Sequence, residues 1–167
     1  MNSILKVLWI LSFVSAGLLL ILSYGYLPDD IILFDASYSV MSKSTFFNYN
    51  LITLAVLFFI ARIFHKGIRE MNWAFVFPLS RNWRKDAEKR DAYRIHIDSW
   101  LTSIFMVFNV LFMITIFLIW SGNDGLVFSY QNVFIVALLL FATILILTLI
   151  IPPFIIYRGP VNSENGS

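Results

Sequence analysis

The chain has 167 residues, of which 59% are hydrophobic and 13% are charged, with a net charge of +2 at pH 7. About a quarter of the residues of a soluble domain are charged, so this composition excludes both an ordinary water-soluble domain and a disordered chain. The absence of cysteine excludes disulfides, thiolate catalysis and cysteine-ligated metal centres. Length and composition together predict a single integral membrane domain over residues 1–167.

Four apolar runs are long enough to cross a hydrocarbon core, which needs about 20 residues of helix. They cover residues 4–22, 46–64, 100–120 and 133–151. These runs are continuously apolar, whereas the strands of a transmembrane barrel alternate every second residue. The sequence therefore predicts an all-α bundle of four transmembrane helices. A signal peptide is an alternative for the first run, since Lys6 would supply its basic region.

Basic side chains are distributed unevenly between the connecting segments. Nine of the twelve lie within residues 62–98, from the end of the second run to the start of the third: Arg62, Lys66, Arg69, Arg81, Arg84, Lys85, Lys89, Arg90 and Arg94. Lys6 and Arg158 flank the bundle on the same side, and only Lys43 lies on the other. Because Lys and Arg are enriched in cytoplasmic loops, we predict that both termini and residues 65–99 are cytoplasmic.

The outer segment, residues 25–45, alternates loosely around Ile31, which indicates an extended conformation. It carries three acidic residues, Asp29, Asp30 and Asp35. Paired carboxylates can bind a divalent cation or act in acid–base catalysis. Aspartates that follow a proline more often shape a turn or cap a helix, and we favour that interpretation here.

The cytoplasmic segment, residues 65–99, has two different halves. Residues 71–79 are apolar and aromatic, and their Trp73, Phe75 and Phe77 are predicted either to lie in the headgroup layer or to dock against another protein. Residues 81–98 combine good helix formers with mixed charges, which predicts a salt-bridged surface helix that continues into the third run. Over residues 62–98, five acids, Asp98 among them, reduce nine positive charges to a net charge of +4, and we expect no nucleic-acid binding. The tail, residues 152–167, is predicted to be frayed.

Few residues of this sequence are candidates for catalysis or for binding a cofactor. His65 and His96 end the second run and precede the third, so a hairpin could bring them together as haem or metal ligands. Bulky neighbours crowd both, and we expect ordinary interfacial histidines with no cofactor and no metal. No span contains an acid, and no histidine is available outside to activate a serine, so we expect neither a proton path nor an enzyme. Asn109 is predicted to hydrogen-bond across helices, beside a small-residue pair, Ser12 and Ala16.

The segment between the first two runs resembles a small membrane module of unknown function. The residues that carry the resemblance are Leu27, Pro28, Asp30, Ile31, Phe34, Asp35, Ser42, Lys43 and Phe46. This module opens many bacterial multi-span proteins, including the immunity proteins against sporulation-delaying toxin. The resemblance covers about residues 4–64 and departs from the module at Leu33, where a histidine is usual, and in lacking a turn glycine. It implies two helices joined by this loop and adds no catalytic residue.

These observations predict a non-catalytic accessory or scaffold subunit of a larger complex in a bacterial inner membrane. Its expected partners are the lipid bilayer and other membrane protein subunits. The alternative is an autonomous immunity or sensor protein that binds a toxin or peptide through residues 25–45. A third hypothesis, a small transporter, requires oligomerisation to build a pore.

Overall fold

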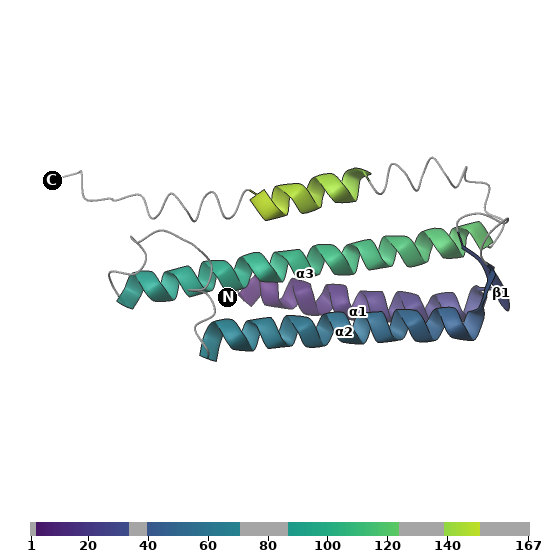
Figure 1. The fold of residues 1–167 in the computed structure, drawn as a ribbon, viewed down its shortest axis with the longest axis horizontal. Helices are drawn as coiled ribbons and strands as arrows, with labels where there is room; N and C mark the ends of the chain where they lie inside the picture. Colours follow the sequence, from purple (N-terminus) through teal and green to yellow (C-terminus); the bar gives the residue numbers. More distant parts are fainter. Residues whose placement is uncertain (1–2, 34–39, 71–86, 124–138, 151–167) are drawn as a thin grey trace.

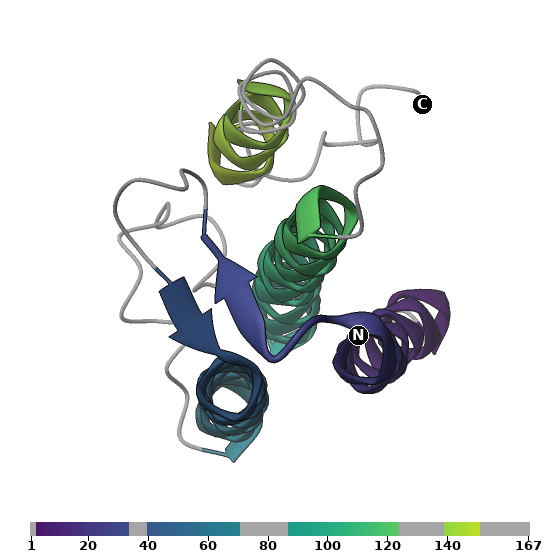
Figure 2. The same cartoon turned by 90° about the vertical axis from the view of Figure 1, so that its right-hand side faces the viewer.

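The computed structural model describes residues 3–33, 40–70, 87–123 and 139–150. Its elements are, in chain order, α1 (Ser3–Tyr26), β1 (Asp30–Ile32), β2 (Val40–Ser42), α2 (Lys43–Glu70), α3 (Ala87–Asn123) and a shorter apolar helix, Leu139–Ile150. The three long helices run side by side, and the two strands lie at one end of them (Figure 1). In the end-on view of Figure 2, α3 is the central helix, surrounded by α1, α2 and the shorter helix.

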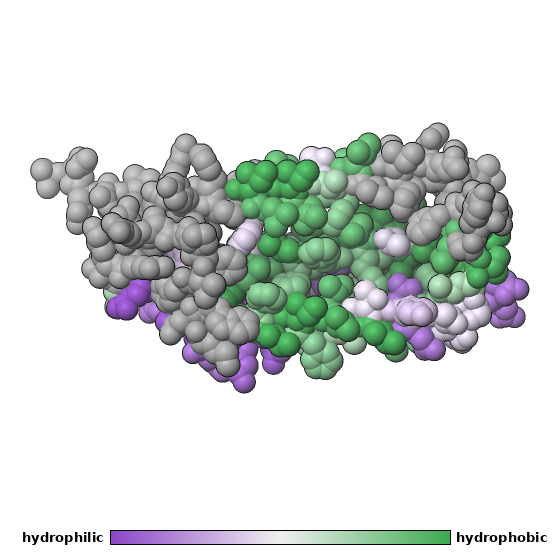
Figure 3. Space-filling view, in the orientation of Figure 1, coloured by the Kyte–Doolittle hydropathy of each residue, from purple (hydrophilic) through white to green (hydrophobic). Residues whose placement is uncertain are grey.

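By length and composition, α1, α2 and α3 can each cross a membrane. Only 17% of the apolar stretch of α1 and 28% of that of α2 is buried, so most apolar side chains of these helices point outward. Figure 3 shows a hydrophobic band on one face of the molecule, with hydrophilic residues toward its two ends. Such a band is unfavourable in contact with water and favourable in contact with the hydrocarbon core of a lipid bilayer. The predicted all-α class is confirmed, with three membrane-spanning candidates.

The helix ends differ from the limits of the apolar runs. α2 begins three residues before the predicted 46–64 and ends six residues after it. The early start follows from an N-cap, because the Thr45 amide donates a 3.3 Å hydrogen bond to the Ser42 hydroxyl. α3 is one helix of 37 residues, which confirms that the charged segment from Ala87 continues into the third apolar run. At about 1.5 Å per residue α3 exceeds the hydrocarbon thickness by roughly 25 Å.

The fourth predicted span is described only over Leu139–Ile150. This helix lies along α3 (Figures 1 and 2), where the Trp100 indole donates a 2.8 Å hydrogen bond to the carbonyl oxygen of Thr148. The rings of Phe108 and Phe141 add a contact with centroids 6.4 Å apart. The number of spans and the side on which the termini lie remain predictions.

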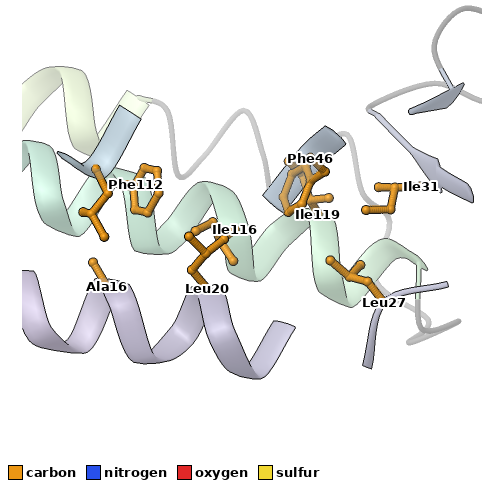
Figure 4. Close-up of a cluster of buried hydrophobic side chains, with 9 residues drawn as sticks. Ala16, Leu20, Leu27, Ile31, Phe46, Phe112, Ile116 and Ile119 are labelled. Atoms are coloured by element: carbon orange, nitrogen blue, oxygen red, sulfur yellow. The ribbon is translucent and has the colours of Figure 1, made fainter. Parts of the chain in front are cut away.

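Two clusters of buried side chains hold α1, α2 and α3 together. The outer cluster, next to the strands, contains Ala16, Leu20, Leu27, Ile31, Phe46, Leu54, Phe112, Ile116 and Ile119 (Figure 4). The inner cluster contains Trp9, Ala61, Ile68, Tyr93, Ile97, Leu101 and Phe105. Between the clusters, Asn109 Nδ2 donates a 3.0 Å hydrogen bond to the Ser12 hydroxyl, which confirms the predicted cross-helix bond.

β1 and β2 form an antiparallel hairpin with the register Asp30↔Ser42, Ile31↔Met41 and Ile32↔Val40. The predicted extended conformation is confirmed for Asp30–Ile32. Because successive side chains of a strand alternate between its faces, Ile31 enters the outer cluster and is fully buried, whereas Ile32 is exposed. One face of the hairpin therefore closes the end of the bundle at which the strands lie, and the other face is exposed.

Candidate functional site

A cluster of ionisable side chains, centred on a buried carboxylate, joins α2 to α3 at the end of the bundle remote from the strands. His65 Nδ1 lies 2.5 Å from Asp98 Oδ1, and Arg69 Nη2 lies 3.3 Å from Oδ2, the other oxygen of the same carboxylate. His65 is 8% exposed and Asp98 is 3% exposed. We call His65, Arg69 and Asp98 the inner triad.

Helix spacing places both His65 and Asp98 in the interior. His65 lies one turn from Ala61 and Ile68, which are almost fully buried, so its ring shares their face of α2. Asp98 lies one turn before Thr102, whose hydroxyl donates a 2.7 Å hydrogen bond to the Asp98 carbonyl oxygen. The ring of Trp9 on α1 stands edge-on to His65, with centroids 5.5 Å apart. His65 and Asp98 are thus enclosed by all three long helices, whereas the Arg69 side chain is 53% exposed.

Both oxygens of the Asp98 carboxylate are occupied, which balances a charge that burial alone would disfavour. Because a carboxylate only accepts hydrogen bonds, His65 Nδ1 carries the proton between the two residues. The other ring nitrogen, Nε2, is buried and has no hydrogen-bond partner among the described residues. A carboxylate orients catalytic and metal-binding imidazoles in the same way. The described residues, however, include no group of three metal-ligating side chains, and within them the triad works as a charge-balanced clamp between α2 and α3.

The two histidines singled out in the sequence lie in different environments. His96 is exposed, whereas His65 is buried. His96 stands two residues before Asp98 on α3, which is about 200° around the helix. The face that carries His96 is therefore turned away from the face that meets His65. The structure brings His65 to Asp98 instead.

The position of Asp98 differs from the one expected for it. The mixed charges around it predict a salt-bridged surface helix, whereas its carboxylate is buried at the inner triad. A signal for this burial exists, because seven of the twelve buried residues of α3 recur at intervals of three and four, the spacing of one helix face. This stripe consists of Asp98, Leu101, Phe105, Asn109, Phe112, Ile116 and Ile119. Extending it beyond the apolar run predicts a buried position for Asp98.

The outer hairpin is fixed to the bundle by polar contacts as well as by Ile31. The Ile32 amide donates a 2.8 Å hydrogen bond to Asn123 Oδ1, and Asn123 Nδ2 donates a 3.1 Å bond to the Ile32 carbonyl oxygen. The side chain at the end of α3 thereby imitates a neighbouring strand. At the start of α2, the Lys43 amide donates a 2.8 Å bond to the carbonyl oxygen of Asp29, the residue before β1. These contacts hold the hairpin against α2 and α3.

Two of the three outer acids are described by the structure. Asp29 and Asp30 are exposed at the start of the hairpin, and Asp35 lies outside the described residues. The face of the hairpin directed away from the bundle also exposes Ile32 and Val40, which are opposite each other in the register. Acidic and apolar groups therefore lie together on a fixed surface. The predicted docking residues Trp73, Phe75 and Phe77 lie outside the described residues.

Comparisons of this chain with protein-family models, with curated proteins and with solved structures found no match in any of the three. The arrangement of the residues themselves is therefore the basis for the functional argument.

Proposed function

We propose that this chain is a non-catalytic integral membrane protein that binds a protein or peptide partner through its outer hairpin. The observation that carries the proposal is the outward face of that hairpin. Ile32 is 44% and Val40 63% exposed there, beside the exposed Asp29 and Asp30. A partner with apolar and cationic side chains complements such a surface, because it covers the apolar pair and neutralises the acids.

The contacts that hold the hairpin in place support a role in binding a partner, beyond that of a linker between α1 and α2. A surface that is already ordered loses little conformational entropy when a partner binds, and this favours affinity. Asn123 and Ile31 supply that order from the bundle side. The resemblance of residues 27–47 to the outer loop of the immunity-protein module supports the same choice of surface. We place the hairpin outside a bacterial inner membrane, on the basis of the basic residues gathered at the opposite end.

Site-specific photo-cross-linking in cells tests the proposal. A photoactivatable residue is introduced at Val40, and in a control at Tyr49 of α2, which is also 63% exposed but lies within the predicted span 46–64. We expect a discrete protein or peptide adduct from position 40 and only lipid adducts from position 49. D29N/D30N should weaken the adduct at position 40 without affecting membrane insertion. Identical products from the two positions, or an adduct indifferent to D29N/D30N, would contradict the proposal.

A second candidate function, an accessory subunit of a larger membrane complex, is favoured by a groove of about 720 Å³ between α3 and the helix Leu139–Ile150. Its lining is apolar and includes Met106 and Met113, whose flexible side chains adapt to different partners. A helix of another subunit would fit this surface. Native electrophoresis in mild detergent with mass spectrometry of co-migrating proteins tests this function, and migration of the chain alone would count against it.

A further inference from the structure

A hollow of about 460 Å³ lies on the outer surface of α2, close to its C-terminal end. Its apolar part is formed by Phe59 and Ile63, which are 64% and 56% exposed. Its polar part is formed by three basic side chains, Arg62, Lys66 and Arg69. The apolar side chains lie toward the middle of the helix and the basic ones extend toward its end, so the hollow crosses the border between the apolar band and the polar end of the bundle.

The positive charge of the hollow is only partly compensated. Arg62 makes no ion pair with any described residue, and Lys66 has a 3.7 Å contact with Glu70, in which both side chains are about two-thirds exposed. Such an exposed pair is weak. Arg69 is held by Asp98 at 3.3 Å. Counting Glu70 and Asp98, the charge of the region is +1, and it is concentrated at Arg62 and Lys66, one helical turn apart.

The base of the hollow is rigid. His65 forms part of its wall and is fixed from behind by Asp98, while the neighbouring Gly67 and Ile68 are buried against the bundle. Arg62 and Lys66 therefore project from a backbone that the inner triad holds in place. Long basic side chains at a helix end reach along the surface to the headgroup level of a membrane.

We propose that this hollow binds the phosphate-containing headgroup of an anionic phospholipid. The phosphate lies between Arg62 and Lys66, and an acyl chain follows Phe59 and Ile63 toward the middle of the bilayer. Arg and Lys donate several charge-assisted hydrogen bonds to phosphate oxygens. A soluble anion would use the basic part alone, whereas a lipid also covers the two exposed apolar side chains, and this favours the lipid.

The test uses the full chain purified in dodecyl maltoside, with bound lipid counted by native mass spectrometry. Palmitoyl-oleoyl phosphatidylglycerol and the matching phosphatidylcholine are titrated separately, and inorganic phosphate is added as a competitor. We expect the chain to prefer phosphatidylglycerol by about tenfold or more, and R62Q/K66Q to weaken its binding by about 25-fold, since each basic side chain near an anionic lipid contributes about fivefold. E70Q, which removes the competing acid, should strengthen binding, a result that misfolding cannot imitate.

K6Q/R90Q is the matched control, because it removes two exposed basic side chains from the same end of the bundle, on α1 and α3. We expect this control to bind phosphatidylglycerol like the unaltered chain. Equal binding of the two lipids would overturn the proposal, as would an equal loss in K6Q/R90Q, which would indicate diffuse charge attraction. Displacement of the lipid by millimolar inorganic phosphate would also overturn it, in favour of a soluble anion site.

Discussion

The inner triad predicts a steep order of stability losses among substitutions at one end of the bundle. Asp98→Ala removes the acceptor of His65, whose side chain is 10% exposed, and that of Arg69, whose side chain is 53% exposed. His65 loses a charge-assisted hydrogen bond, about 1.5–3 kcal/mol, and its Nδ1 is left buried without that partner. Arg69 turns to water and contributes less than about 1 kcal/mol. We therefore expect Asp98→Ala to lower the free energy of unfolding by about 2–4 kcal/mol.

Two comparisons separate this cause from a general loss of charge. Asp91→Ala removes the same side chain from the same helix, but the Asp91 side chain is 70% exposed and its ion pair among the described residues is with Arg94, at 3.1 Å. We expect a change within about 0.5 kcal/mol there. His65→Ala leaves the Asp98 carboxylate buried with Arg69 alone and should be nearly as damaging as Asp98→Ala. The double variant should then lose clearly less than the sum of the two single losses.

Equilibrium unfolding in mixed micelles of dodecyl maltoside and dodecyl sulfate, followed by far-ultraviolet circular dichroism, measures these free energies. The reasoning would be refuted if Asp98→Ala matched Asp91→Ala, or if the losses at positions 65 and 98 simply added. Either result would mean that the carboxylate is hydrated and contributes no more than a surface charge.

The same measurement checks two further predictions. Ile31→Ala should lower the free energy of unfolding by about 2–4 kcal/mol, because Ile31 is fully buried in the outer cluster, whereas Ile32→Ala, at a 44% exposed neighbour, should change it by less than about 0.5 kcal/mol; equal effects would show that the hairpin does not pack as described. Asn109→Ala should cost about 1 kcal/mol through the lost bond to Ser12, and Ser12→Ala should cost little in addition once Asn109 is gone; fully additive losses would show that the two side chains do not interact.

The helices could be predicted from the sequence because a continuously apolar run of about 20 residues, in a chain with so few charges, is typical of a membrane-spanning helix. The residues at which the helices begin and end are harder to predict. The start of α2 at Lys43 depends on the Ser42 cap, and its end at Glu70 depends on the buried positions of His65 and Ile68. Those burials reflect contacts with α3, more than twenty residues further along the chain. Apolar runs predict where a helix can cross a membrane, and tertiary packing sets how far it continues.

The inner triad could be predicted only in part, for a related reason. A helical stripe indicates that Asp98 and His65 each lie on the inner face of their own helix. It does not indicate which residue of another helix lies opposite, because that depends on the relative rotation and height of the two helices. The charge composition gives no sign of the contact between His65 and Asp98 either, since nine basic and five acidic residues in one segment suggest a solvated mixture. One of those acids is nevertheless buried against a histidine.

Two polar residues of the α3 stripe, and the partly exposed Asn123 beyond it, each bond to a different element. Asp98 contacts His65 of α2, Asn109 donates to Ser12 of α1, and Asn123, four residues after Ile119, exchanges two hydrogen bonds with Ile32 of β1. Apolar side chains of neighbouring membrane helices pack against lipid about as favourably as against each other, so they specify height and rotation weakly. A shift of α3 by one helical turn, about 5.4 Å, would break all three polar contacts together and leave Asp98 buried without a partner. The central helix is thus positioned at three levels, against three different elements, by three polar side chains whose hydrogen-bond partners lipid cannot replace.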